Sequence, residues 1–151
     1  MKSVDSLNAN GIHFELITLK EAVHTAQDVA VACDCSVAQV LKTMLFIGKQ
    51  VPVIAIVAGD ARVDSKKLGK LIGNSSLRMA TADEVNALTG YEVGSVSPFG
   101  LQADIQKVLD DGVFGLEAVY VGSGVKDVII RLDSAALQKA WDGVVAPIIK
   151  Y

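Results

Sequence analysis

The chain has 151 residues, 51% of them apolar, which is enough to form the core of one domain without support from disulfides or metal. No apolar stretch approaches the about 20 residues that a membrane span needs, and no basic-then-apolar leader stands at the N-terminus. We therefore expect a cytoplasmic protein that does not bind a membrane, folded as a single domain over residues 1–151. The net charge of −3 argues against a protein that holds nucleic acid by its overall charge.

Cysteine and histidine are scarce. Cys33 and Cys35 are the only cysteines, and their separation by one residue is a poor geometry for a disulfide. His13 and His24 are the only histidines, and neither has a metal-ligand spacing from the cysteines. We expect two free thiols, no metal and no other cofactor.

The N-terminal third alternates between helix and strand signals. The expected elements are a helix at residues 4–9, a strand at 14–18, a helix at 26–33 and a short helix that begins at residue 36. Thr25 and Asp28 have the spacing of an N-terminal capping pair, as do Ser36 and Gln39.

Two strongly apolar strands follow, at residues 41–47 and 51–57, and the three residues between them predict a hairpin. A lysine-rich helix is expected at residues 64–72. A second helix, capped by Thr81, is expected to run to residue 88.

The last third predicts strands at residues 118–121 and 127–132, a helix at 134–141 and a final strand at 144–149. Many short strands with hairpin-like joins favour an α+β fold over a doubly wound parallel sheet. We expect a mixed, mostly antiparallel, barrel-like sheet surrounded by helices.

Lys42 interrupts the apolar strand at residues 41–47, where a fully buried ammonium would be costly. One interpretation is a lysine whose stem packs on the sheet while its head reaches water. The other is a functional lysine.

A charged segment follows the second apolar strand. Strand ends commonly carry binding loops, so Asp60 is a candidate site residue that could pair with Lys42 or Arg62, whereas Asp64 more simply caps the next helix. Residues 62–78 hold five basic side chains and one acidic side chain. A solvated helix face and a nucleic-acid contact both explain this cluster.

Residues 90–100 are too long and too rich in Gly, Ser and Pro for a simple turn. Their backbone amides could hold a carboxyl, a phosphate or a developing oxyanion. The alternative is an ordered connection between a helix and the next strand.

Three segments occur in a distinctive order: Lys42 and Thr43 before an apolar strand, residues 57–68 (VAGDARVDSKKL) and residues 88–101 (LTGYEVGSVSPFGL). In this the sequence resembles the YbaK/prolyl-tRNA editing family over residues 25–132. The resemblance implies a mixed, barrel-like sheet surrounded by helices. It also implies metal-free hydrolysis of the aminoacyl ester at the 3′ end of mischarged transfer RNA.

The resemblance also implies roles for individual residues. Lys42 matches the family's functional lysine, and His24 lies near a pocket-side polar position. The loop that helps to form the aminoacyl pocket corresponds to Gly94, Ser95, Val96, Ser97 and Pro98. The predicted contacts to the acceptor stem are Arg62, Lys66, Lys67 and Lys70. Such enzymes rely on substrate groups, such as a ribose hydroxyl or a substrate thiol, which agrees with the absence of a Ser/His/Asp or Cys/His signature.

Two departures leave the amino acid open. The His-Pro segment of alanine-removing members is missing, and residues 122–126 (GSGVK) replace the Gly-Lys-Arg-Gly-like loop of cysteine-removing members. Gly122, Ser123 and Gly124 either line the pocket or form a plain hairpin turn.

We expect an enzyme that edits mischarged aminoacyl-tRNA in trans. Its expected substrate is tRNA(Pro) carrying a small wrong amino acid such as Cys or Ala, and a prolyl-tRNA synthetase is a candidate partner. The alternatives are a non-catalytic module that binds aminoacyl-tRNA or an amino acid, and an accessory partner of a synthetase.

Overall fold

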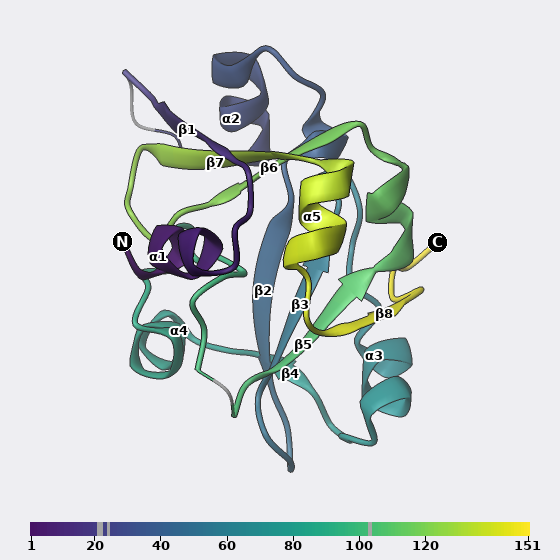
Figure 1. Ribbon diagram of the computed structural model, residues 1–151. Helices are drawn as coiled ribbons and strands as arrows, with labels where there is room; N and C mark the ends of the chain where they lie inside the picture. Colours follow the sequence, from purple (N-terminus) through teal and green to yellow (C-terminus); the bar gives the residue numbers. More distant parts are fainter. Residues whose placement is uncertain (21–22, 24, 103) are drawn as a thin grey trace.

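A computed structural model describes residues 1–20, 23, 25–102 and 104–151 (Figure 1). In chain order the elements are α1 (Lys2–Ala9), β1 (Glu15–Thr18), α2 (Ala26–Cys33), η1 (Val37–Gln39), β2 (Lys42–Ile47), β3 (Val53–Val57), α3 (Ser65–Ile72), β4 (Arg78–Met79), α4 (Ala82–Thr89), β5 (Gln106–Asp110), η2 (Asp111–Gly115), β6 (Ala118–Gly122), β7 (Val128–Asp133), α5 (Ser134–Ala140) and β8 (Val144–Ala146). Here η denotes a short 3₁₀ helix. In the described residues no helix has the length and apolar character needed to cross a bilayer.

The strands form two sheets. The larger has the order β4-β2-β3-β5-β8 and the smaller β1-β7-β6, which crosses the upper end of the larger sheet in Figure 1. The predicted hairpins β2–β3 and β6–β7 are present, and β5 pairs in parallel with both β3 and β8. The mixed α/β character is confirmed, with four antiparallel and two parallel pairings among the strands of the described residues.

The expectation of a barrel-like sheet is wrong, because neither sheet closes within the described residues. In the larger sheet β4 and β8 stand at opposite edges, separated by three strands, and do not meet. The smaller sheet has its own strand order and does not close the larger one into a barrel. The helices therefore pack on two open sheets rather than around a closed one.

Local signals place the helix ends. The Thr25 side chain accepts a hydrogen bond from the Asp28 N–H at 3.1 Å, and Thr81 and Glu84 form both halves of a capping box. The Asp64 carboxylate accepts from the Lys66 and Lys67 amides, each at 3.1 Å, which begins α3 and lowers the pKa of Asp64. These bonds confirm the predicted caps.

Strand β2 separates two cores. Leu45 packs into the core that lies between the two sheets, whereas Phe46 packs into the core beneath α3. Just before β2, Val40 bridges Tyr120 of β6 in parallel, and the Leu41 N–H donates to the Tyr120 carbonyl at 2.9 Å. The chain thus leaves the smaller sheet and enters the larger one at Lys42.

Candidate active site

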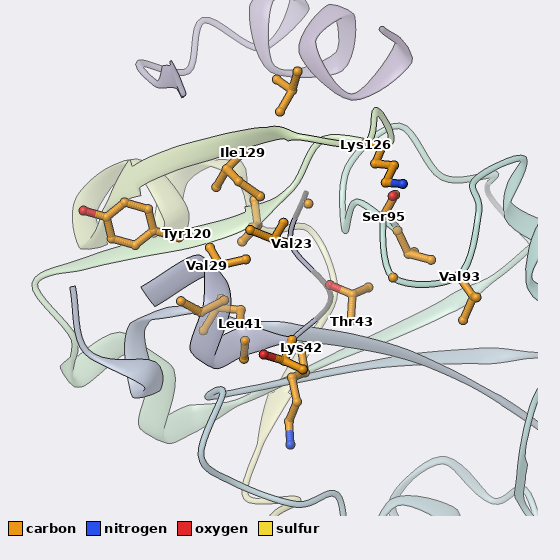
Figure 2. A pocket seen from close by; sticks show the side chains of 18 of the residues that line it. Val23, Val29, Leu41, Lys42, Thr43, Val93, Ser95, Tyr120, Lys126 and Ile129 are labelled. Carbon is orange, nitrogen blue, oxygen red and sulfur yellow. The ribbon is translucent and has the colours of Figure 1, made fainter. Parts of the chain in front are cut away.

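A cavity of about 500 Å³ opens where the two sheets meet. Its walls come from α2, from the start of β2, from the loop at residues 92–96 and from the β6–β7 hairpin (Figure 2). One wall is apolar and includes Val29, Tyr120 and Ile129. A volume of this size suits a small ligand held on an apolar surface by a few polar groups.

Lys42 stands at the edge of this cavity. Its side chain is half-buried and points away from Thr43, since neighbouring residues of a strand face opposite sides (Figure 2). The ammonium donates to the carbonyl of Ala61. Burial and then the charge of Arg62 lower the pKa of Lys42, and the charge of Asp60 partly offsets this.

Lys42 also borders a second cavity of about 450 Å³, together with Arg62 and Met44. Residue Lys42 therefore borders both cavities, and its ammonium points away from the side of β2 that carries Thr43. Asp60 is exposed and lines neither cavity; it acts on Lys42 through its charge.

The loop after α4 is tied down at several points. The Ser95 N–H donates to the Glu92 carbonyl at 3.0 Å, and the Ser95 carbonyl accepts from the Gly124 N–H at 2.9 Å. The Tyr91 hydroxyl donates to the Phe99 carbonyl at 2.8 Å, and burial raises the pKa of Tyr91 to about 12. The loop backbone is therefore fixed before any ligand arrives.

Gly94 is a residue of this loop with free space around it. Its φ is +86°, and a Cβ there would meet no atom within 4 Å. Within the described part of the chain, the N–H groups of Gly94 and Val96 have no recorded acceptor, whereas that of Ser95 is used internally. The amides that remain for a ligand are those of Gly94 and Val96.

The structure brings some of the predicted site residues together and separates others. The predicted residues that line the first cavity are Lys42, Gly94, Ser95, Val96 and Gly122. Ser97, Pro98, Ser123 and Gly124 lie behind this lining. The Ser97 hydroxyl accepts from the Phe99 N–H, and the Ser123 hydroxyl donates to the Val128 carbonyl at 2.7 Å. Their roles as substrate contacts stay predictions, and His24 lies outside the described residues.

The structure places residues 122–124 partly at the cavity and partly in the hairpin turn. Gly122 ends β6 and lines the cavity, where a Cβ would lie 2.6 Å from the Val96 carbonyl oxygen. Gly124 belongs to the turn, with φ +92°, and a Cβ there would lie 2.1 Å from Tyr91 Cε1. Glycine at both positions lets the hairpin approach the loop closely.

Replacing Gly124 with alanine is expected to lower the free energy of unfolding by about 2 kcal/mol or more, because the added carbon overlaps Tyr91 and φ is unfavourable. Urea unfolding measures the change. Gly115→Ala is the control, since its Cβ would meet no atom within 4 Å. Equal midpoints for the two variants would contradict the close packing.

The four predicted acceptor-stem contacts are all exposed. Lys66 and Lys70 lie on α3, whereas the Lys67 ammonium donates to the Ile149 carbonyl at 3.2 Å and lies 4.9 Å from the centre of the Tyr151 ring. Nearby, Arg78 pairs with Glu84 at 2.7 Å. The basic segment therefore presents less unpaired charge than its sequence suggests.

The polar residues of the cavity that sequence reasoning did not assign to the site are Thr25, Thr43, Glu92, Lys126 and Asp127. Thr43 was visible only as the neighbour of Lys42, and no local signal marks Asp127. In the described residues no cluster of three or more His, Cys, Asp or Glu side chains could hold a metal ion. The expected absence of metal stays a prediction.

Comparison with known proteins places this site in a family. A family model described as an aminoacyl-tRNA editing domain matches residues 20–140. Proline–tRNA ligase of Aquifex aeolicus is 29% identical over 106 residues, which are 70% of this chain and 19% of the ligase, so the chain spans about a fifth of such a relative. EbsC of Enterococcus faecalis, provisionally named a Cys-tRNA(Pro)/Cys-tRNA(Cys) deacylase, is 29% identical over 125 residues, 82% of this chain and 76% of EbsC.

Solved structures agree with this relationship. A protein provisionally described as a trans-editing enzyme for prolyl tRNA synthetase superposes with a TM-score of 0.90 at 28% identity, covering 99% of this chain and 96% of that one. The resemblance indicated by the sequence motifs is confirmed. The chain belongs to the aminoacyl-tRNA editing domain family.

Proposed function

We propose that this chain acts as a single editing domain that hydrolyses, in trans, the ester of tRNA(Pro) carrying a small wrong amino acid. One observation carries the proposal: Lys42 borders the same cavity as Gly94 and Val96, whose N–H groups have no acceptor among the described residues. Cysteine is the first amino acid to test, because the related EbsC carries a name of that specificity.

The proposed chemistry needs no protein nucleophile. A water molecule attacks the ester carbonyl carbon, and the carbonyl oxygen gains negative charge that the amides of Gly94 and Val96 stabilise. The bond to the ribose oxygen breaks, and that oxygen takes a proton. The products are a free amino acid and a transfer RNA with an intact 3′ end. The Lys42 ammonium holds the terminal nucleotide or stabilises its negative charge.

The apolar wall supports a preference for small side chains. Val29, Tyr120 and Ile129 fix its position from α2 and the smaller sheet. One methylene group changes discrimination by only about 1 to 3 kcal/mol, so we expect graded preference rather than absolute exclusion.

Deacylation assays across a panel of charged transfer RNAs test the proposal. The enzyme releases free amino acid over many turnovers, with the highest rate on a small amino acid attached to tRNA(Pro). A non-catalytic binding module would instead protect the ester. An accessory partner would be active only when its synthetase is present, and either result would overturn the proposal.

Replacing Lys66 and Lys70 together with glutamine is expected to weaken binding to all transfer RNAs alike, because both ammonium groups are exposed on one face of α3. Each lost phosphate contact reduces the slope of log affinity against log salt by roughly 0.7 to 0.9. Titrations at several salt concentrations measure this slope. A control double variant at Lys49 and Lys139 should keep it, and an unchanged slope at α3 would identify a solvated helix face.

A further inference from the structure

Two buried side-chain oxygen atoms of the described residues have no hydrogen-bond partner. Within the described part of the chain, the side-chain nitrogen and oxygen atoms in this state are Thr43 Oγ1 and Asp127 Oδ1. Both residues line the cavity at the junction of the sheets. A buried polar atom without a partner is destabilising, and proteins leave few of them. Their presence in one cavity indicates that a ligand supplies the missing partners.

The backbone around Asp127 is well fixed. Asp127 lies between the hairpin turn and β7 with φ +68°, and its carbonyl accepts from the Leu19 N–H at 2.7 Å. An aspartate at positive φ is less favourable than a glycine. The fold therefore keeps a carboxylate here despite two unfavourable features, its backbone conformation and its unpaired oxygen.

No cation of the described chain forms an ion pair with Asp127. Lys42 donates to the Ala61 carbonyl and points away from the side of β2 that carries Thr43. Lys126 is exposed and points toward the loop that carries Ser95 (Figure 2). Within the described residues, therefore, no side chain supplies a counter-charge in contact with this carboxylate.

We propose that the Asp127 carboxylate binds the α-ammonium group of the aminoacyl ester, with the Thr43 hydroxyl bonding to an adjacent oxygen of the substrate. This inference rests on the proposed function. The α-ammonium is the cation that every aminoacyl ester carries, whatever its side chain. The site then selects esters with a free α-amino group and rejects those in which this group is acylated or replaced.

The rejection follows from the unpaired carboxylate. An α-hydroxy ester of the same shape would leave the buried Oδ1 of Asp127 without a counter-charge, and an N-acetyl group would in addition need space at the carboxylate. Sites built around a polar partner discriminate strongly against analogues that lack it. We expect the α-hydroxy ester to react at least about 50-fold more slowly in kcat/KM.

The experiment compares three acyl forms of one mischarged transfer RNA: the aminoacyl ester, the α-hydroxyacyl ester made from it by nitrous acid, and the N-acetylated ester. The rate without enzyme is subtracted for each. The quantity measured is the ratio of kcat/KM for the aminoacyl form to that for the α-hydroxyacyl form. Asp127→Asn is expected to bring this ratio close to one by losing rate on the aminoacyl form alone.

The variants separate binding from folding. Asparagine tolerates positive φ, and Asp127→Gly removes the carboxylate while relieving the backbone, so both variants should remain folded. In both, the ratio of kcat/KM for the aminoacyl form to that for the α-hydroxyacyl form should fall close to one. Glu92→Gln removes an exposed carboxylate from the same cavity and should leave this ratio unchanged. A wild-type ratio near one, or an unchanged ratio in Asp127→Asn, overturns the inference while leaving deacylation intact. Failure of the wild type to hydrolyse any aminoacyl-tRNA overturns the proposed function, and the inference with it.

Discussion

Replacing Lys42 with alanine is expected to reduce the rate of deacylation about a hundredfold or more in a protein that remains folded. The ammonium is held in place by the Ala61 carbonyl and by partial burial, so in the proposed reaction it would not have to be ordered first. Single-turnover deacylation measures the loss, and thermal unfolding shows that the fold survives.

Lys139→Ala is a matched control for Lys42→Ala. Its ammonium also donates to a backbone carbonyl, that of Gly11 at 3.2 Å, but it lines neither cavity. Its removal should leave the rate within a few-fold of the wild type. Near-normal turnover by folded Lys42→Ala would remove this lysine from the mechanism.

Gly94→Val is expected to abolish measurable deacylation, whereas Ser95→Ala should slow it by less than about tenfold, or roughly 1.4 kcal/mol at the transition state. Valine at φ +86° is strained, and its side chain would enter space that is empty in the structure, at a residue that lines the cavity. Alanine at position 95 keeps the N–H bond to Glu92 and the carbonyl bond from Gly124.

A valine at Gly73 separates strain from blockage. Gly73 also has positive φ, +68°, and open space around a Cβ, but it ends α3 and lines neither cavity. Gly73→Val should lose stability and keep activity. If Ser95→Ala were as damaging as Gly94→Val, the Ser95 hydroxyl would take part directly and the role assigned to the backbone would be wrong.

Local chemistry made part of this fold predictable. The caps at Thr25, Asp64 and Thr81 depend on residues at most three positions apart, so their sequence spacing is sufficient to place them. Strand β5 was missed for the opposite reason. Val108, Leu109 and Asp110 are all buried, and a strand buried on both faces shows no alternation. Because β5 was not predicted, its parallel pairings could not be predicted either, and neither could the open form of the larger sheet.

The candidate site was likewise predictable only in part. Lys42 and Gly94 were identified because a family motif carries them, and the structure places both on one cavity. The inward-facing roles of Ser97 and Ser123 depend on which side of a loop faces the core, which spacing does not record. Asp127 stands out only because its buried Oδ1 has no hydrogen-bond partner, and that property depends on three-dimensional packing, which sequence spacing does not show.

The crossing of the chain from one sheet to the other at Lys42 has an evolutionary consequence. Val29, Val40 and Tyr120 form a small apolar cluster of their own beneath the smaller sheet and α2, and they also line the cavity. Lys42 lies instead on the larger sheet, and α3 packs through Leu68 on the core beneath that sheet. Substitutions in the smaller cluster can therefore reshape the apolar wall, proposed to hold the amino acid, while the groups proposed to hold the nucleic acid keep their positions. An ancestral domain of this architecture could acquire new amino-acid preferences by drift in a handful of apolar side chains.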